Sequence, residues 1–536
     1  MIIAQYTIRS KQDYIFKTNK VLEIVGASEN IARIWNELFN AANRIGLKYQ
    51  RVNEPFNFEK IKQKFDDGTL DFVELFCGGG NETMLFSGNV EVINGKTVKA
   101  NDDSPITKLN REFSYKLLKD YPGMTSMVVF TDVKEDYCDD YDRLMAEAER
   151  KKNVMEPEWD IFTVPFAMMD RETFQPYSKV KKIGGNDDRM SDETYGKYEV
   201  GARLKEDNQD VRLFDDMVTQ KGKESLLAVV HADGNNMGSK IMEMLHGETD
   251  YDKAVALMRE FTSTTADCFE KEGDAALKRC QFELLENNDG AIKSGKIKKS
   301  SLAYRRIIGS GDDVTFICNA RFVMQYVKAY LSSVQEYQKK KNSKWNYSSC
   351  AGICIFHSHY PFSRAYSIAE QACECAKRKV HISDETGKPI NIEQGWMDFH
   401  FIHSGIDGDL EEIRRSQGTD KCIARPWLVT CENSKDTVIN GYVYDDLLKL
   451  KKIFDKKRDE NGKESYKGTK VSRTAIKTIG SAYERSESAA KKELIALYGH
   501  TPGLERDIEE LYPNEGTFLK AVYDFAEIYD IWYTEV

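Results

Sequence analysis

The sequence predicts an α+β protein made of two similar strand–helix units followed by a helical region. At 536 residues the chain is too long for one hydrophobic core. Its 41% hydrophobic and 31% charged content is typical of soluble globular proteins. We expect one domain at 1–182, a second at 225–404 and a helical C-terminal domain at 405–536. The polar, Gly- and Asp-rich segment 183–224 is interpreted as a linker or mobile excursion.

The first unit is expected to begin on a strand at Ile2–Ile8, followed by a helix whose apolar residues recur at helical spacing. Two strands then flank a glycine-rich turn at Gly79 and Gly80. The predicted elements are Ile2–Ile8, Asn30–Ile45, Phe72–Phe76, Met84–Val90, Thr107–Asp120, Ser126–Phe130 and Tyr141–Lys152.

The second unit repeats this order, with a strand, a long helix, a hairpin, and then helix, strand and helix. Its elements are Leu226–Ala232, Asp252–Glu272, Leu302–Ile308, Val314–Cys318, Val323–Lys339, Cys350–Phe356 and Ser363–Arg378. The last third carries helical patterns at Gly441–Arg458, Ala482–Leu497 and Phe518–Trp532. The charged stretch Asp455–Lys470 is expected to be an exposed loop.

Composition narrows the class of protein. The net charge is −10, which argues against a protein that coats nucleic acid without specificity. No apolar run approaches the ~20 residues that span a bilayer, so no membrane association is expected. The N-terminus shows no leader, and the 11 cysteines form no CxxC pair, which disfavours a zinc ribbon. Scattered thiols favour a cytoplasmic location.

Three aspartates carry the chemistry that the second unit predicts. Asp233 follows the first strand, and Asp312 and Asp313 lie at the tip of the hairpin. Carboxylates are the ligands that Mg²⁺ or Mn²⁺ prefers, and the backbone carbonyl of Ala232 would add another oxygen. An ordinary Asp-rich turn is the alternative interpretation. The combination with Asp233 favours a metal site for nucleotidyl transfer.

The residues around these acids predict a nucleotide site. Small residues at Ser310 and Gly311 allow close approach of backbone to a nucleotide. The run after Asp233 precedes a helix at Ser239–Leu245 and could present N–H groups to a triphosphate; it consists of Gly234, Asn235, Asn236, Met237 and Gly238. Lys377 is either a triphosphate contact or a cation that stabilises a helix C-terminus.

Aligning the two units as a repeat indicates that only one of them can bind metal. The alignment sets Arg9 against Asp233, and Asn81 against Asp312. An arginine and an amide cannot replace carboxylates as ligands of a hard divalent cation. The first unit is therefore expected to be metal-free.

These motifs resemble a known family. The pair of units is similar to the cyclase core of the large, polymerase-like subunit of type III CRISPR effector complexes, or to a compact standalone relative of it. The matching motifs are 233–238 (DGNNMG), 310–313 (SGDD), Ala351-Gly352-Ile353, Ala376-Lys377, Arg425-Pro426-Trp427 and, in the first unit, 12–16 (QDYIF) and 26–28 (GAS). The resemblance implies two ferredoxin-like palm domains of the nucleotide-cyclase or polymerase type, plus the helical C-terminal domain.

The resemblance further implies synthesis of a cyclic oligoadenylate from ATP, for antiviral defence signalling. Asp233, Asp312 and Asp313 would hold the metal and Lys377 would contact the triphosphate. Gly79 and Gly80 would approach the nucleotide on the first palm, with Ser28 and Ser263 near adenine. The sequence has Ser310 where the family has its first glycine, and it shows neither the nuclease motif nor zinc-ribbon cysteines. Cleavage of single-stranded DNA is therefore not expected.

Two alternative functions remain open at this point. One is a cyclic dinucleotide synthase or a template-dependent palm polymerase, and the other is a non-catalytic nucleotide-binding subunit of a CRISPR ribonucleoprotein. The expected partners are ATP or other NTPs, together with subunits of a CRISPR RNA–protein complex, an RNA activator or a second copy of the chain. Base choice, ring size, linkage and the activating signal cannot be deduced from the sequence.

Overall fold

The structure is a computed structural model, which describes residues 1–93, 96–152, 167–183, 185–204, 214–218, 225–381, 394–403, 408–429, 441–459, 461–464, 468 and 470–532. The chain forms two compact units. Unit 1 comprises Met1–Leu213, Asn236–Glu270 and Ile307–Asp313, and unit 2 comprises Phe214–Asn235, Lys271–Arg306 and Val314–Val536. The predicted boundaries at 224 and 404 lie outside the described residues, and the predicted domain limits stay predictions.

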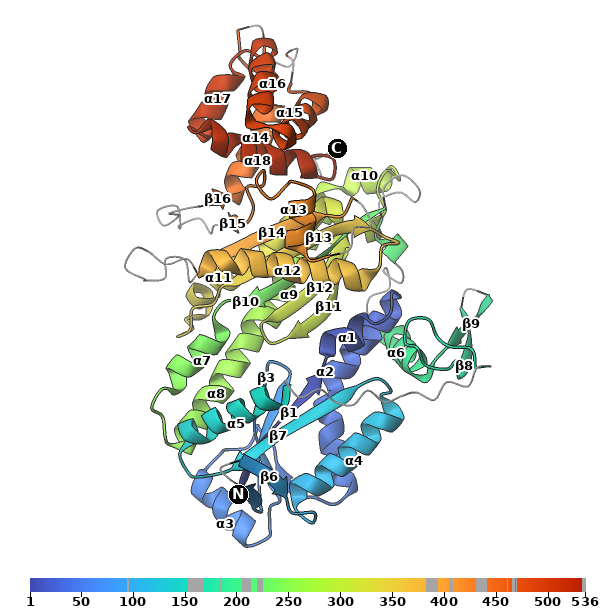
Figure 1. Cartoon of the computed structure of the whole chain (residues 1–536), viewed down its shortest axis with the longest axis vertical. Coiled ribbons are helices and arrows are strands. Elements are labelled where there is room, and N and C mark those ends of the chain that lie inside the picture. Colours follow the sequence, from blue (N-terminus) through green and yellow to red (C-terminus); the bar gives the residue numbers. More distant parts are fainter. Residues whose placement is uncertain are drawn as a thin grey trace. The chain divides into compact units, whose positions relative to one another are not determined.

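Unit 1 is built on a five-stranded sheet in the order β2-β3-β4-β1-β7 (Figure 1). Its central strand β1 pairs antiparallel with both β4 and β7. The strands are β1 (Ile2–Arg9), β2 (Tyr49–Gln50), β3 (Phe72–Gly78), β4 (Asn81–Phe86) and β7 (Thr125–Asp132). The helices before β8 are α1 (Lys11–Phe16), α2 (Val21–Arg44), α3 (Phe58–Asp66), α4 (Pro105–Asp120) and α5 (Tyr137–Lys152), and β5 (Val90–Ile93) pairs with β6 (Lys96–Ala100).

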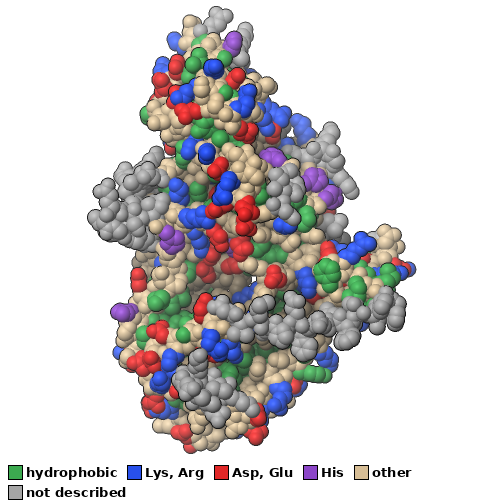
Figure 2. Space-filling view, viewed as in Figure 1, with side chains coloured by type: hydrophobic (Ala, Val, Ile, Leu, Met, Phe, Trp, Pro, Cys, Tyr) green, Lys and Arg blue, Asp and Glu red, His purple; other side chains and the backbone are tan. Residues whose placement is uncertain are grey.

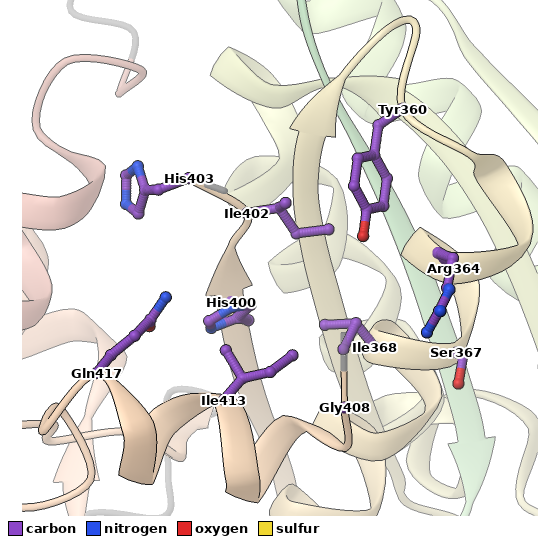
Figure 3. A pocket seen from close by; sticks show the side chains of 10 residues that line it. All are labelled: Tyr360, Arg364, Ser367, Ile368, His400, Ile402, His403, Gly408, Ile413 and Gln417. Atoms are coloured by element: carbon purple, nitrogen blue, oxygen red, sulfur yellow. The ribbon is translucent and has the colours of Figure 1, made fainter. Parts of the chain in front are cut away.

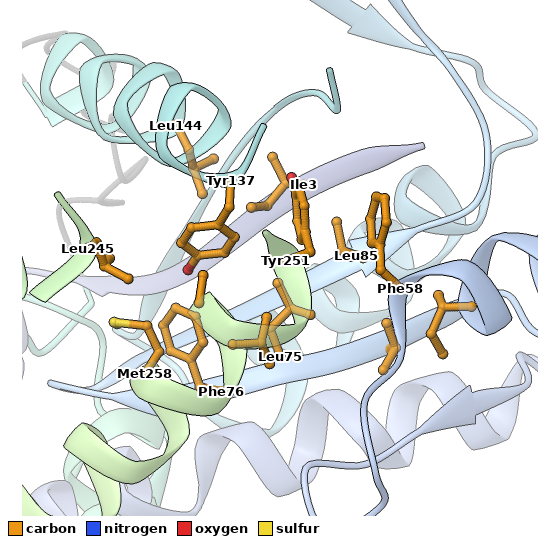
Figure 4. Close-up of a cluster of buried hydrophobic side chains, with 14 of the residues drawn as sticks. Ile3, Phe58, Leu75, Phe76, Leu85, Tyr137, Leu144, Leu245, Tyr251 and Met258 are labelled. Atoms are coloured by element: carbon orange, nitrogen blue, oxygen red, sulfur yellow. The ribbon is translucent and has the colours of Figure 1, made fainter. Parts of the chain in front are cut away.

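The core of unit 1 includes two helices that follow β10 in the chain, α7 (Met237–Leu245) and α8 (Tyr251–Thr265). Tyr251 stacks on Phe58 with ring centroids 4.2 Å apart and meets Tyr137 edge to face (Figure 4). The Tyr251 hydroxyl donates to Asp140 at 2.6 Å. Arg259 donates to the backbone oxygens of Glu54, Glu74 and Leu75, so α8 is fixed along β3 by aromatic packing and by hydrogen bonds.

The segment that the sequence assigned to a linker or excursion contains regular structure. The hairpin of β8 (Lys179–Ile183) and β9 (Asn186–Met190) leads into α6 (Asp192–Arg203), which packs on α2. Gly26 and Gly201 lie at this crossing, where a Cβ atom on Gly201 would come 1.9 Å from the backbone oxygen of Leu22. Only glycine allows the two helix backbones to approach this closely, which composition alone did not reveal.

Unit 2 contains most of a seven-stranded sheet in the order β11-β12-β10-β13-β14-β15-β16. The central strand β10 pairs antiparallel with β12 and β13, and so repeats the arrangement around β1. The strands are β10 (Leu226–Gly234), β11 (Tyr304–Ser310), β12 (Asp313–Asn319), β13 (Ser349–His357), β14 (Gly395–Phe401), β15 (Trp427–Val429) and β16 (Tyr442–Val443).

Helices complete this layer. The predicted helix Asp252–Glu272 is longer than expected, because α8 continues through a π-helical turn at Ala266–Glu272 into α9 (Gly273–Asn287). Helix α12 lies directly on β13, since a Cβ atom at Gly352 would come 1.9 Å from the backbone oxygen of Ala369. The other helices are α10 (Asp289–Lys293), α11 (Val323–Lys341), α12 (Phe362–Val380) and α13 (Leu410–Ser416), with short 3₁₀ turns at Phe214–Asp216, Lys299–Leu302 and Ala320–Phe322.

The C-terminal part of unit 2 is helical, as the sequence predicts, but two local expectations are wrong. The single helix expected at Ala482–Leu497 is broken at Ser486, whose extended backbone ends one helix and whose hydroxyl accepts from Ala489 N at 3.1 Å to start the next. The expected exposed loop contains a buried residue, Arg458, bound to Asp507 at 2.7 Å. The helices are α14 (Tyr444–Asp455), α15 (Arg473–Arg485), α16 (Glu487–His500), α17 (Leu504–Leu511) and α18 (Glu515–Ile528).

The α+β fold class is therefore confirmed, with two sheets of related topology and a helical C-terminal region. Acidic and basic side chains are both present across the face shown in Figure 2, in keeping with the mixed charge composition. Within the described part of the chain, no helix has the length and apolar character needed to cross a membrane.

Candidate active site

The end of β10 carries the first predicted acid. Asp233 is the second-to-last residue of β10, and its side chain is half-buried. Its carboxylate pairs with the ammonium of Lys377 at 2.5 Å, and Lys377 also donates to the backbone oxygen of Gly234 at 3.1 Å. The Asp233 charge raises the pKa of Lys377 against the opposing effect of burial. Lys377 therefore stays protonated. Its charge is paired with Asp233, a predicted metal ligand, and does not only face the C-terminal end of its own helix.

Helix α12 delivers Lys377 to this position. The close approach at Gly352 seats α12 on β13, and β13 is the neighbour of β10 in the sheet. The end of β10 is also held by β13, because Ser349 Oγ donates to the backbone oxygen of Asp233 at 3.0 Å. Asp233 and Lys377 are thus held by adjacent elements of one sheet layer.

The hairpin acids lie beside Asp233 by strand register. The β10–β12 ladder ends with the pair Ala232 and Val314, so the next residues along the two strands are Asp233 and Asp313. Asp312 occupies the turn between β11 and β12. Both hairpin acids are half-buried. Among the described residues no three His, Cys, Asp or Glu side chains are gathered closely enough to hold a metal ion by themselves.

The residues predicted to cradle the triphosphate separate into two kinds. Asn235 is 2% exposed and anchors the strand end, donating from Nδ2 to Ser348 Oγ at 2.8 Å and to the backbone oxygen of Gln394 at 3.1 Å. Asn236 instead takes a left-handed conformation, φ 55°, and begins α7 without a side-chain cap. Helix α7 begins at Met237, two residues earlier than the predicted Ser239, so Met237 and Gly238 lie in its first turn. Presentation of N–H groups to a triphosphate stays a prediction.

Within unit 1 the two hairpin tips lie against each other. Gly79 and Gly80 form the turn between β3 and β4 with φ of 57° and 70°, a conformation that glycine adopts without strain. A Cβ atom on Gly311 would lie 3.4 Å from Gly79, and one on Gly80 would lie 3.0 Å from Ser310 Oγ. The tighter of these two approaches is the one at Gly80, while the 3.4 Å distance at Gly311 is an ordinary van der Waals contact.

Lys11 binds the tip of the first hairpin and was not singled out by the sequence. Its ammonium donates to the backbone oxygens of Gly79 at 3.3 Å and Gly80 at 3.1 Å. Burial lowers the pKa of Lys11, and the charge of Asp313 opposes that shift. The only sequence signal is its place two residues after the first strand. Glu270 is a second missed residue, since its carboxylate accepts from Gly311 N at 2.7 Å.

The adenine contacts expected from the resemblance are less well defined. Ser28 lies half-buried on α2. Ser263 lies exposed on α8, next to Thr262, whose methyl group would be 2.5 Å from a Cβ atom on Gly78. It is Thr262, the neighbour of Ser263 in the chain, that lies against the base of the first hairpin. Both adenine contacts stay predictions.

The register corrects the alignment of the repeat. In unit 1 the β1–β4 ladder ends with Thr7 opposite Asn81, the first residue after the turn. In the second hairpin the first residue after the turn is Asp313, and the ladder's last pair, Ala232 and Val314, puts Asp233 next along β10. Thr7, rather than Arg9, therefore stands at the position of Asp233, and Asn81 stands at that of Asp313. The sequence alignment missed this because it does not show which residues of two strands are paired.

The corrected alignment still leaves the first hairpin without a metal-binding carboxylate. Glu82, the residue after Asn81 on β4, is 1% exposed. Burial and the neighbouring Glu74 raise the pKa of Glu82 well above its ordinary value. A protonated, buried carboxyl group does not serve as a ligand for a hard divalent cation.

A separate pocket lies in unit 2, and none of the predicted site residues lines it. Tyr360 and Arg364 line one side, and His400 and His403 approach from the end of β14 (Figure 3). Its volume is about 20 Å³, room for roughly one water molecule. Burial lowers the pKa of His400 to about 3, so the imidazole is neutral. A pocket of this size is a hydration site rather than a substrate site.

Comparison with known proteins identifies the segment that carries Asp233, the hairpin and Lys377. Residues 226–383 match the family model of the Cas10/Cmr2 second palm domain. This confirms the resemblance for that segment, and residues 226–383 are hereafter called the palm domain. No curated protein matches the whole sequence.

Three solved structures are distant matches to the chain. An apo Csm1–Csm4 cassette shares 12% identity and a TM-score of 0.49, covering 98% of this chain and 69% of that one. A Csm1–Csm4 cassette in complex with cA4 shares 10% identity and a TM-score of 0.46 over the same shares. A type III-B Cmr-beta complex in its apo state shares 11% identity and a TM-score of 0.46, covering 99% and 82%.

Proposed function

We propose that this protein is a Mg²⁺-dependent nucleotidyltransferase that makes a cyclic oligoadenylate-type second messenger from ATP, in CRISPR-type antiviral defence. The observation that carries the proposal is the β10–β12 register, whose last pair, Ala232 and Val314, adjoins Asp233 and Asp313 in a segment that matches the second palm domain. The Lys377 ammonium on Asp233 adds a cation suited to a triphosphate.

The side chains present fit a divalent metal. Asp233, Asp312 and Asp313 with the carbonyl of Ala232 form an all-oxygen donor set, which Mg²⁺ or Mn²⁺ prefers. Mg²⁺ is commonly held by one or two carboxylates plus substrate phosphates and water, so an all-protein cage is not required. When bound, the metal would neutralise charge on the phosphates and make the attacking hydroxyl more acidic.

The protein side chains would position the reactants. A ribose 3′-hydroxyl attacks the α-phosphate of ATP, forms a new P–O bond, loses its proton to solvent and releases pyrophosphate. Lys377 would exchange its contact with Asp233 for the triphosphate, since both are anionic. Ser310 and Gly311 leave room for the donor nucleotide. Gly79 and Gly80, held by Lys11, would border the acceptor nucleotide on the metal-free hairpin.

The partners would follow from this chemistry. ATP is the proposed substrate, and an RNA or the subunits of a CRISPR ribonucleoprotein are the proposed activators. A cytoplasmic location and formation of a homo-oligomer are compatible with this role but are not required by it.

The identity of the product tests the proposal. The full chain is incubated with each NTP and Mg²⁺, alone and with RNA, and the products are analysed by mass spectrometry. We expect cyclic oligoadenylates from ATP. Template-dependent linear products would instead indicate a polymerase, and cyclic dinucleotides would indicate a dinucleotide synthase. ATP binding without any product under every condition would overturn the enzymatic proposal.

A further inference from the structure

A second cavity in unit 2 lies away from the predicted acids. It has a volume of about 510 Å³, within the range of small-molecule sites. It opens where the end of α12, strand β14, helix α13 and the turn before β15 meet. Five of its lining residues are cationic and three are acidic. The cations are Arg378, Lys379, Arg414, Arg415 and Arg425.

The floor of the cavity is neutralised by ion pairs. The two terminal nitrogens of Arg414 donate to the two carboxylate oxygens of Asp398 at 3.0 and 2.7 Å. Arg414 Nη2 also donates to the backbone oxygen of Phe399 at 2.9 Å. Arg425 lies 3.6 Å from the same carboxylate and binds Asp524 at 3.0 Å. Arg414 is 5% exposed, and its Nε has no hydrogen-bond partner among the described residues. The floor thus keeps two buried donors, Arg414 Nε and Arg425 Nε, without a hydrogen-bond partner among the described residues, which costs free energy.

The rim holds the excess positive charge. Arg415 is exposed and makes no ion pair within the described part of the chain. Lys379 is half-buried, lies 5.9 Å over the Trp396 ring and likewise has no acidic partner among the described residues. Burial lowers the pKa of Lys379, and the neighbouring cation Lys520 on α18 lowers it further. Two cations that repel each other are stabilised by an anion placed between them.

The one rim ion pair is weak enough to yield to a ligand. Arg378 pairs with Glu411, and the two side chains are 66% and 50% exposed. Exposed pairs of this kind contribute only about 0–1 kcal/mol. Guanidinium groups bind phosphate through two parallel hydrogen bonds, more specifically than ammonium groups do. The rim can therefore offer Arg378, Lys379 and Arg415 to one anionic ligand.

We propose that this cavity is a second binding site, for the polyphosphate group of a small nucleotide, separate from the palm-domain acids. Its volume fits a ligand that carries several phosphates, as do the rim cations Lys379 and Arg415, which have no acidic partner among the described residues. The proposal does not depend on the catalytic function, because none of Asp233, Asp312, Asp313 and Lys377 lines the cavity.

Binding of inorganic tripolyphosphate and of ATP, in EDTA, tests the proposal by calorimetry on the full chain. Removing both rim cations, with Lys379→Gln and Arg415→Gln, is expected to weaken binding at least tenfold. The matched control removes two exposed cations that do not line the cavity, with Arg485→Gln and Lys492→Gln, and should change affinity less than twofold. Lys377→Gln should leave this binding in place, which separates it from the palm-domain acids.

Two outcomes would overturn the proposal. One is equal affinity in the rim and control variants, whose thermal unfolding is compared by circular dichroism to confirm that both are folded. The other is that a short oligoribonucleotide without terminal phosphates binds in a way that depends on the rim cations, while tripolyphosphate and ATP do not bind. That result would assign the cavity to a nucleic-acid strand instead.

Discussion

At the residue scale, the strand ends decide which hairpin can bind metal. Thr7 and Asn81 occupy the register positions that Asp233 and Asp313 occupy in the palm domain. The departure at Ser310 from the glycine of similar proteins is tolerated structurally, because Ser310 ends β11 and the turn's left-handed position falls on Gly311, φ 69°. A serine at the strand end needs no unusual backbone conformation.

Lys11 is expected to act as a positioning residue for the proposed reaction. Lys11→Met removes the ammonium that binds the carbonyls of Gly79 and Gly80, so the hairpin tip loses its only side-chain tether described here. We expect kcat/KM for ATP to fall at least tenfold, with Lys11→Arg partly restoring it. Pyrophosphate release measures the rate, and separate kcat and KM values distinguish positioning from loss of fold.

The control for Lys11 is Lys60→Met on α3, which removes an exposed lysine of the same unit. This variant should keep wild-type kinetics. If Lys11→Met also keeps them, the tether has no role in the reaction.

Glu23 predicts a pH dependence of stability. It is fully buried on α2, and burial raises its pKa to about 7 from the ordinary 4.5. A carboxyl group whose pKa is raised on folding stabilises the protein most below pH 4.5, and that contribution is lost as the pH rises through 7. Glu23→Gln should leave stability unchanged at pH 4 and raise it by up to roughly 3 kcal/mol at pH 8.

Urea unfolding of both proteins between pH 4 and 8 measures this difference. A difference that is the same at every pH would show that Glu23 does not titrate in this window.

At the element scale, glycines fix how helices approach their neighbours. Gly352 brings α12 onto β13 and so places Lys377 on Asp233, while Gly26 and Gly201 bring α6 onto α2. These contacts decide side-chain positions many residues away. They also explain why helices and strands were predictable from periodicity while their packing was not.

Gly201→Ala is expected to loosen α6 from α2. The added methyl group would lie 1.9 Å from the Leu22 backbone oxygen, and overpacking of this kind costs about 1–3 kcal/mol or more. Hydrogen exchange of the α6 amides should accelerate markedly. Gly196→Ala on the same helix meets no atom within 4 Å, so it should slow exchange slightly, because alanine favours helix. Equal exchange in the two variants would contradict the packing account.

At the scale of the whole molecule, the order of strands and helices could largely be predicted from the sequence. Apolar periodicity located β1, α4, β10, the Asp312 hairpin, α11, β13 and α12, because each buries one face or a continuous run. Short strands such as β14–β16 were missed, since a few residues carry too little pattern. Packing of α8 in the core of unit 1 was also missed, because it depends on contacts such as Tyr251 with Phe58.

The candidate site was predictable to a similar extent. Asp233, the hairpin acids and Lys377 could be picked out because few residue types bind metal and triphosphate. Lys11, Glu270 and the anchoring role of Asn235 could not, since each depends on a backbone atom far away in the chain. The match of Thr7, rather than Arg9, with Asp233 likewise depends on how the strands pair, which the sequence does not show.

Pyrophosphate release from ATP, with and without Mg²⁺, tests the central claim most directly. The wild-type chain is compared with the double variant Asp312→Ala and Asp313→Ala, after circular dichroism has shown that the variant is folded. We predict Mg²⁺-dependent release by the wild type, measured with whichever RNA activates it, and release at background by the variant. Undiminished release by the folded double variant in the presence of Mg²⁺ would contradict the assignment of these acids as the metal site.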